Sequence, residues 1–169
     1  PDIQEIIAAE KAERAKPVIE DITLFSGSGT AGETVRIVHS RLDMGYLAAV
    51  FDSKPYSLIR TETANPMVLD MSFPEPHRFT QISVRVGGAP TLVRATLFPS
   101  DGGDPVTFTA EVNRSSDFRD VTIDLPAPVE SDHLRLEIET VGEGEPAHVH
   151  VYEIRLEGEG WKNGTTAAP

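Results

Sequence analysis

The sequence predicts an antiparallel β-sandwich with one short N-terminal α-helix. From Val18 onward, short β-branched and aromatic runs follow one another, separated by Gly, Pro, Asp and Ser. Several runs alternate apolar and charged residues, as Leu134, Leu136 and Ile138 do, which gives each strand one apolar face. Many short strands of this kind pack as two antiparallel sheets.

The first 16 residues, PDIQEIIAAEKAERAK, predict the only helix. Ile3, Ile6 and Ile7 can share one stripe, and the segment is rich in good helix formers. Asp2 is a suitable N-cap, and Pro17 ends the pattern. Two interpretations stay open: a connecting helix from a preceding domain, or a helix that packs on the sandwich or simply ends the chain.

Nine strands are expected after this helix, separated by turns such as GGAP and SDGGDP. The expected ranges are 22–26, 34–40, 67–73, 79–87, 91–99, 106–112, 120–126, 133–141 and 148–158. Residues 41–66 form a long interruption, and loops of this length are often functional. Within it, Leu47, Val50 and Phe51 are expected to point inward from a helical turn.

This pattern divides the chain into three parts. Residues 1–17 are a helix or linker, residues 18–158 are the sandwich, and residues 159–169 are a C-terminal tail. The chain begins with Pro and shows no secretion signal, so we expect a fragment of a longer polypeptide.

Composition and charge narrow the class of function. A net charge of −12 disfavours nucleic acid and anionic lipid as partners. The absence of cysteine excludes disulfides, thiolate metal sites and cysteine nucleophiles. No apolar run approaches the roughly 20 residues that cross a bilayer, so membrane insertion by this region is not expected.

Two distant motifs resemble one known family. Val50, Phe51 and Asp52 begin the first motif, which continues to Thr61, and Glu153 begins the closing EIRLEG. In order and spacing these resemble the discoidin family, also called the coagulation factor 5/8 C-type or galactose-binding-like domain. The resemblance covers roughly residues 20–158. It implies a jelly-roll sandwich that is non-catalytic, is attached to a larger exported or surface protein, and most often binds sugar.

The resemblance also implies a structural calcium ion, held by the Asp52 loop and by Glu153. Lys54 stands where the family often has Asp or Asn, and an ammonium has the wrong charge for a calcium shell. We therefore expect no cofactor, with calcium as a doubtful alternative. Lys54 is a candidate to replace the ion by pairing with Asp52 or Glu153.

Sugar binding requires an apolar or aromatic surface together with fixed polar groups. The candidate ligand-binding residues are Tyr56, Arg60, Glu62, Asn65 and His77. The alternative function is a structural or protein-interaction domain, with a neighbouring protein domain as its partner. Trp161 is expected to cover the core or the helix from the tail.

The sequence contains no recognisable catalytic motif. His148 and His150 lie two apart and would face one side of a strand, but a zinc site needs a third ligand of fixed geometry. No nucleophile elbow is present, and no carboxylate pair stands out among the many acids. The region is therefore not expected to be an enzyme.

Overall fold

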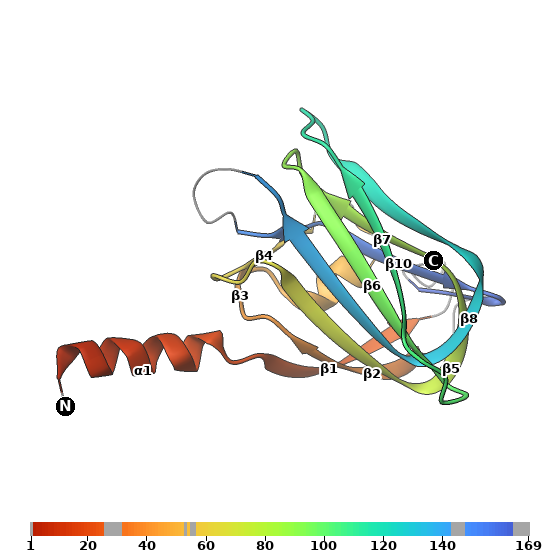
Figure 1. Cartoon of the computed structure of the whole chain (residues 1–169), viewed down its shortest axis with the longest axis horizontal. Helices are drawn as coiled ribbons and strands as arrows, with labels where there is room; N and C mark the ends of the chain where they lie inside the picture. The colour runs from red at the N-terminus through yellow and green to blue at the C-terminus, as the bar shows by residue number, and fades with distance from the viewer. Residues whose placement is uncertain (1, 26–31, 53, 55–56, 143–147, 164–169) are drawn as a thin grey trace.

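The computed structural model describes residues 2–25, 32–52, 54, 57–142 and 148–163 (Figure 1). In these ranges, one helix precedes a body made of strands and a single 3-10 turn. The elements are α1 (Ile3–Ala15), β1 (Val18–Phe25), β2 (Gly32–His39), β3 (Leu42–Met44), η1 (Leu47–Phe51), β4 (Ile59–Thr61), β5 (Met67–Val86), β6 (Thr91–Pro99), β7 (Val106–Val112), β8 (Arg119–Thr140), β9 (His150–Val151), β10 (Glu153–Gly158) and β11 (Trp161–Lys162).

Antiparallel pairing joins most of these strands into one eight-stranded sheet. Its main path runs β1-β2-β5-β8-β6-β7, while β10 pairs with β5 and β11 pairs with β10. The remaining strands form a small sheet in the order β3-β4-β9. The predicted all-β sandwich is confirmed.

Two long strands connect the two layers of the sandwich. The first half of β5, residues 69–72, pairs with β2, and its second half, residues 79–85, pairs with β10. The register between β5 and β8 shifts between Ser72 and His77, where both strands curve around one end of the molecule (Figure 1). We call this the bend end, and we call the opposite end, where α1 joins β1, the helix end.

The core lies between the layers and follows the alternation of the sequence. Ile82, Val84 and Val86 face inward from β5, and Leu134, Leu136 and Ile138 face inward from β8. The expected helical turn is confirmed as η1, with Leu47, Val50 and Phe51 buried. This turn anchors the long interruption to the core through three apolar side chains, although Met44 and Tyr46 just before it stay exposed.

Several expected strand boundaries are wrong. The separate strands expected at 67–73 and 79–87 are one strand, β5, and those at 120–126 and 133–141 are one strand, β8. The prolines of PEP and PAP suggested turns, but the strands continue through them at the bend. The last expected strand is interrupted at Tyr152, which separates β9 from β10.

Helix α1 begins at its Asp2 cap, as expected, and projects away from the sandwich (Figure 1). It buries none of its residues, and Ile3 remains 71% exposed. The interpretation of α1 as a helix packed on the core is therefore wrong for most of its length. In the described part of the chain, no helix has the length and apolar content required to span a membrane.

Candidate functional site

A pocket of about 520 Å³ lies at the helix end, between the last turn of α1 and the outer face of the sheet. Its volume falls within the roughly 300–1,000 Å³ of small-molecule sites. The described lining residues are Arg14, Ala15, Pro17, Val38, His39, Ser40, Arg41, Thr63, Ala64, Val68, Asp70 and Arg135. We call this the helix-end pocket.

The sheet places three of the lining residues in one row. Val38 of β2 pairs with Asp70 of β5, and Asp70 pairs with Arg135 of β8. Because neighbours in register point to the same face, all three side chains stand on the outer surface. Val68, two residues before Asp70, adds an apolar group to this floor.

The rim of the pocket carries a shared carboxylate. Arg14 Nη1 lies 3.7 Å from Glu62 Oε1, and Arg41 Nε lies 3.5 Å from Glu62 Oε2. The Glu62 side chain, 24% exposed, therefore stands between two guanidinium groups from different elements. At the other side, Asp70 Oδ1 lies 2.6 Å from His133 Nε2, whose ring stacks on Phe98.

The small sheet extends the polar surface away from the pocket. Arg60 of β4 donates two hydrogen bonds to Asp43, from Nε at 2.8 Å and from Nη2 at 3.0 Å. Arg60 also pairs in register with His150 of β9. Glu62 follows β4 directly, and its N–H donates to the Arg41 carbonyl at 2.9 Å. We call the surface of Asp43, Arg60, Glu62 and His150 the polar strip.

The strip has a defined charge state near neutral pH. The hydrogen bonds that Arg60 donates to Asp43 hold the pKa of Asp43 below the ordinary value of 3.8. The same bonds raise the pKa of Arg60. Burial lowers the pKa of His150 below 6.5, and the nearby Arg60 adds to that effect. His150 is therefore neutral, and with Nδ1 donating to the His148 carbonyl, its Nε2 can accept a hydrogen bond.

The residues expected to bind ligand do not form one site. Arg60 and Glu62 lie together on the polar strip. Asn65 instead brackets Thr140, since its amide donates to the Thr140 carbonyl at 2.9 Å and accepts from the Thr140 N–H at 3.0 Å. Tyr56 lies outside the described residues.

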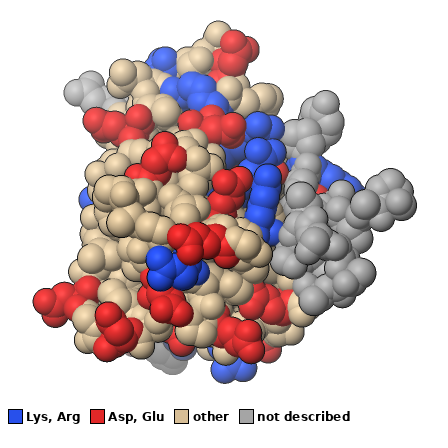
Figure 2. All heavy atoms as spheres, turned by 90° about the vertical axis from the view of Figure 1, so that its right-hand side faces the viewer, with Lys and Arg blue, Asp and Glu red and all other residues tan. Residues whose placement is uncertain are grey.

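His77 lies at the bend end, far along β5 from the polar strip. It contacts Glu33 at 2.7 Å and stacks on Trp161 at 4.2 Å between ring centroids. Trp161 also packs edge-on against Phe73 and Phe79, so it covers the core, which is one of its two expected positions. Figure 2 looks onto this side of the molecule, where acidic side chains are spread across the surface.

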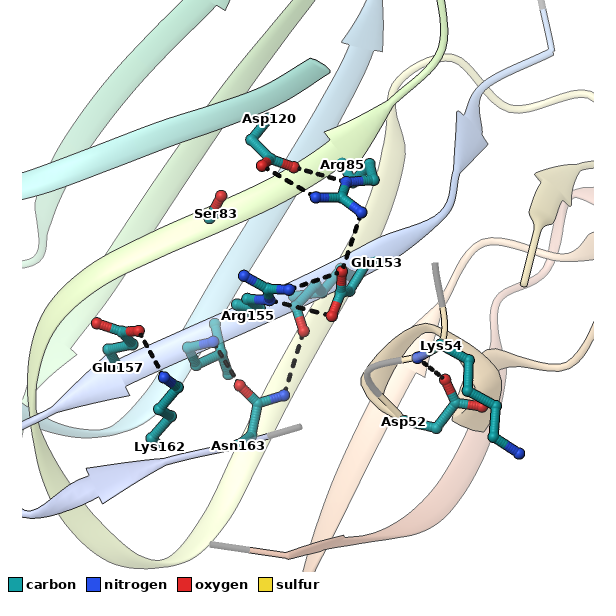
Figure 3. Close-up of polar contacts among 12 residues, drawn as sticks. Asp52, Lys54, Ser83, Arg85, Asp120, Glu153, Arg155, Glu157, Lys162 and Asn163 are labelled. Atoms are coloured by element: carbon teal, nitrogen blue, oxygen red, sulfur yellow. Dashed lines mark hydrogen bonds and ion pairs between the residues drawn. The ribbon is translucent and has the colours of Figure 1, made fainter. Parts of the chain in front are cut away.

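Glu153 is buried and is neutralised by arginine. Its carboxylate accepts hydrogen bonds from Arg155 Nε at 3.0 Å and Arg155 Nη2 at 3.3 Å, and Arg85 Nη1 lies 3.8 Å away. Arg85 in turn donates two hydrogen bonds to Asp120 (Figure 3). The four side chains alternate in charge across β10, β5 and β8.

The expected pairing of Lys54 with Asp52 or Glu153 is wrong. Among the described residues, the Lys54 ammonium forms no ion pair; its side chain is exposed and extends away from Glu153 (Figure 3). The loop is closed instead by the backbone, because the Lys54 N–H donates to Asp52 Oδ1 at 2.8 Å. The cations at Glu153 are instead two arginines, Arg155 and Arg85.

The residues implied for calcium do not fit that ion. Two guanidinium groups already contact the Glu153 carboxylate, and calcium requires six to eight oxygen ligands with excess negative charge. Across the described ranges, no three His, Asp or Glu side chains are arranged to hold a metal ion. His148 and His150 each direct Nδ1 at a backbone carbonyl, of Thr61 and His148 respectively.

Sequence reasoning missed most of the helix-end pocket. Arg14, Arg41 and Arg135 are isolated in the sequence, and only the fold brings them around one cavity. Tyr46, at the start of η1, is 84% exposed and was also not anticipated. Its place in the sequence, shortly before the motif that begins at Val50, could have indicated that it lies at the surface of the loop.

No family model matches this chain, and no curated protein matches it in sequence. Solved structures do match in fold. A family 32 carbohydrate-binding module of NanJ from C. perfringens, in complex with galactose, superposes with a TM-score of 0.54 at 13% identity, covering 73% of this chain and 92% of that one.

Two further matches are similar in quality. A module named GH31 CBM32-2, bound to GalNAc, has a TM-score of 0.56 at 15% identity and covers 76% of this chain and 100% of that one. A Ruminococcus gnavus GH29 fucosidase in complex with fucose has a TM-score of 0.57 at 10% identity. That match covers 79% of this chain but 26% of the fucosidase, so the likeness is to one part of the enzyme.

Identities this low show the fold alone. The implied galactose-binding-like sandwich is confirmed at that level. The chain has the β-sandwich fold of family 32 carbohydrate-binding modules.

Proposed function

We propose that this region is a non-catalytic carbohydrate-binding module, with its sugar site in the helix-end pocket and along the polar strip. The observation that carries this is the pocket itself. It joins an apolar floor at Val38 and Val68 to a rim of charged groups that can bind hydroxyls. The fold shared with galactose-bound and GalNAc-bound modules supports the same proposal.

The polar strip supplies donors and acceptors in fixed positions. Arg60 is held by Asp43, so its planar guanidinium is oriented before a ligand arrives. His150 is neutral and offers Nε2 as an acceptor. Groups fixed in this way bind a sugar with little loss of side-chain entropy.

The same proposal extends to cellular context. Modules of this fold that match the chain are solved as separate domains or as parts of glycoside hydrolases. We infer that the region belongs to a larger exported or surface protein and directs that protein to a glycan.

A second function, protein interaction, is favoured by α1. The helix buries no residue, and Ile6 and Ile7 remain 46% and 43% exposed on its surface. An apolar stripe without a partner in its own domain suits contact with a neighbouring domain. In this candidate function the sandwich would position other domains and bind no sugar.

Titration calorimetry with neutral and acidic monosaccharides separates the two functions. Sugar binding predicts a dissociation constant at or below about 1 mM for at least one sugar, equivalent to about −4 kcal/mol. The Ala64→Trp substitution, in the pocket lining, should fill the cavity and weaken that affinity at least about tenfold.

The matched control is Ala48→Trp, which adds the same side chain at an exposed position outside the pocket lining. It should leave the affinity unchanged. If no sugar binds at millimolar concentration, the carbohydrate function is wrong. Equal weakening by both substitutions would move the site away from the pocket.

A further inference from the structure

Resting on the proposed function, we propose that the helix-end pocket recognises an acidic sugar, and that Arg14, Arg41 and Arg135 bind its carboxylate. The ligand class is a uronic acid or a similar carboxylated unit of a glycan. Three guanidinium groups and one carboxylate, Asp70, line the cavity. The lining itself therefore has more cationic than anionic side chains in a chain whose net charge is −12, and Glu62 and Glu137 offset part of this charge from outside the lining.

The three arginines differ from most others in the chain. Arg60, Arg85 and Arg155 each donate two hydrogen bonds to a carboxylate, and four more donate to one or two acceptors. Those four are Arg36, Arg78, Arg94 and Arg119. Within the described ranges, the arginines that donate no hydrogen bond are Arg14, Arg41, Arg114 and Arg135.

The pocket therefore gathers unused hydrogen-bond donors. Its three arginines have only long ion pairs: Arg14 and Arg41 with Glu62 at 3.7 and 3.5 Å, and Arg135 with Glu137 at 3.6 Å. Their side chains are 66%, 44% and 44% exposed, so a ligand can reach them. A carboxylate that accepts two parallel N–H groups from one guanidinium would form the shorter bonds they lack.

The apolar part of the lining is small, so charged groups would dominate sugar recognition. The described lining contains Val38, Val68, Ala15, Ala64 and Pro17, and its one aromatic ring, the His39 imidazole, is only 3% exposed. Stacking on the face of a pyranose is therefore absent from this lining, and small aliphatic groups provide less contact area. Affinity must come mainly from charged and polar groups, which favours an anionic sugar over a neutral one.

Glu62 already occupies part of the rim. Its two oxygens face Arg14 and Arg41, which shows that this pair of arginines accommodates one carboxylate. A ligand carboxylate would compete with Glu62 for the same groups. Removing the Glu62 charge should then strengthen binding.

The test is calorimetry with two matched pairs of sugars, galacturonate with galactose and glucuronate with glucose. The members of each pair differ only in the carboxylate at C6. We expect at least one acid to bind about tenfold more tightly than its neutral partner, as charge-assisted hydrogen bonds predict. Screening should reduce this preference as NaCl rises from about 20 to 300 mM.

Two variants assign the preference to the pocket. Arg41→Gln and Arg135→Gln should each reduce the acid preference about fivefold or more, since each removes one charged donor pair. Arg114→Gln is the matched control, because Arg114 is exposed, forms no hydrogen bond with a described residue and lies outside the pocket lining. Glu62→Gln should raise the affinity for the acid about threefold.

The outcomes separate the acidic-sugar inference from the proposed carbohydrate function. If the acids and neutral sugars bind equally, the inference is wrong while the carbohydrate function stands. A preference that survives both pocket substitutions, or that falls equally in Arg114→Gln, also overturns it, as does weaker acid binding by Glu62→Gln. If no sugar binds at all, both the inference and the proposed function fail. Thermal melts of each variant establish that the protein is folded.

Discussion

Glu153 is a buried acid neutralised by arginine. Its side chain is 4% exposed, and it lies between Arg155 and Arg85. The closing motif singled out this acid as a metal ligand or loop anchor, whereas its partners lie on the same strand and on β5, where only strand register could reveal them. A motif identifies such a residue; the sheet determines what neutralises it.

The Glu153 network predicts that stability is independent of calcium. Thermal melts with about 1 mM CaCl₂ and with EDTA should coincide to within about 2 °C, since bound ligand would raise the midpoint by mass action. Glu153→Gln should lower the free energy of unfolding by about 1–3 kcal/mol, because a buried charged acceptor of two hydrogen bonds is lost. A calcium-dependent rise of several degrees would contradict this account of the site.

His150 predicts a pH dependence of stability. Its folded pKa lies below 6.5, so the unfolded chain binds the proton more readily than the folded one. The contribution to stability is therefore complete above about pH 6.5 and decreases as the pH falls from that value through the lower folded pKa.

Urea unfolding at about pH 8 and pH 5 measures this effect against His150→Gln, which cannot titrate. Wild type should lose more stability than the variant on acidification. All other side chains are the same in both proteins, so their contribution cancels in the comparison. An equal loss in both would show that burial does not affect the protonation of His150.

At the scale of elements, the agreement with the sequence depends on how a strand ends. The ranges of β6 and β7 were predicted to the residue, because clear alternation is bounded by the glycine-rich SDGGDP turn. The continuity of β5 and β8 through their bend was not predicted. Prolines usually end a strand, but in these two strands they lie where the strand crosses from one layer to the other. Local sequence does not distinguish a turn that ends a strand from a bend in a strand that stays paired with its neighbour.

Gly45 is the element-level position where backbone geometry restricts the residue. It has a φ of 81° between β3 and η1, and a Cβ there would lie 2.0 Å from the Leu58 carbonyl oxygen. Gly45→Ala should cost about 2 kcal/mol or more, from left-handed backbone strain and the displaced strand. Urea unfolding checks this against Gly102→Ala, which has a similar φ of 83° but no atom within 4 Å of the added Cβ. Equal losses would remove the steric part of the argument.

Helix α1 is predicted to contribute little to the stability of the sandwich. Since it buries no residue, deletion of residues 1–13 should change the melting midpoint by less than about 2 °C. The deletion keeps Arg14 in the sequence but removes the helix that positions it. Acid-sugar affinity should therefore fall although the fold is retained. A large decrease in midpoint would show that the helix packs more firmly than its exposure indicates.

For the whole molecule, the fold class followed from the sequence more completely than the site did. The sandwich required only that alternating strands bury one face each, which Leu134, Leu136 and Ile138 illustrate. The pocket floor requires the register of β2, β5 and β8, which places Val38, Asp70 and Arg135 in one row. Those residues are about 32 and 65 positions apart, and no short-range pattern relates them.

The separation of the two ends also decides which expected ligand residues can act together. Arg60 and Glu62 lie at the helix end, whereas His77 stacks on Trp161 at the bend end. The long strand β5 connects these regions. Residues that were expected to bind one ligand together are therefore far apart in the fold. A single sugar cannot contact both groups.

The central claim is that a sugar binds in the helix-end pocket, and chemical-shift mapping tests it most directly. Galacturonate would be titrated into uniformly ¹⁵N-labelled protein while backbone amides and the Trp161 indole are followed. The account predicts the largest shifts at Arg41, Thr63, Val68 and Arg135, with the Trp161 indole unmoved. Shifts centred on Trp161 and His77, or no shifts at about 10 mM sugar, would contradict it.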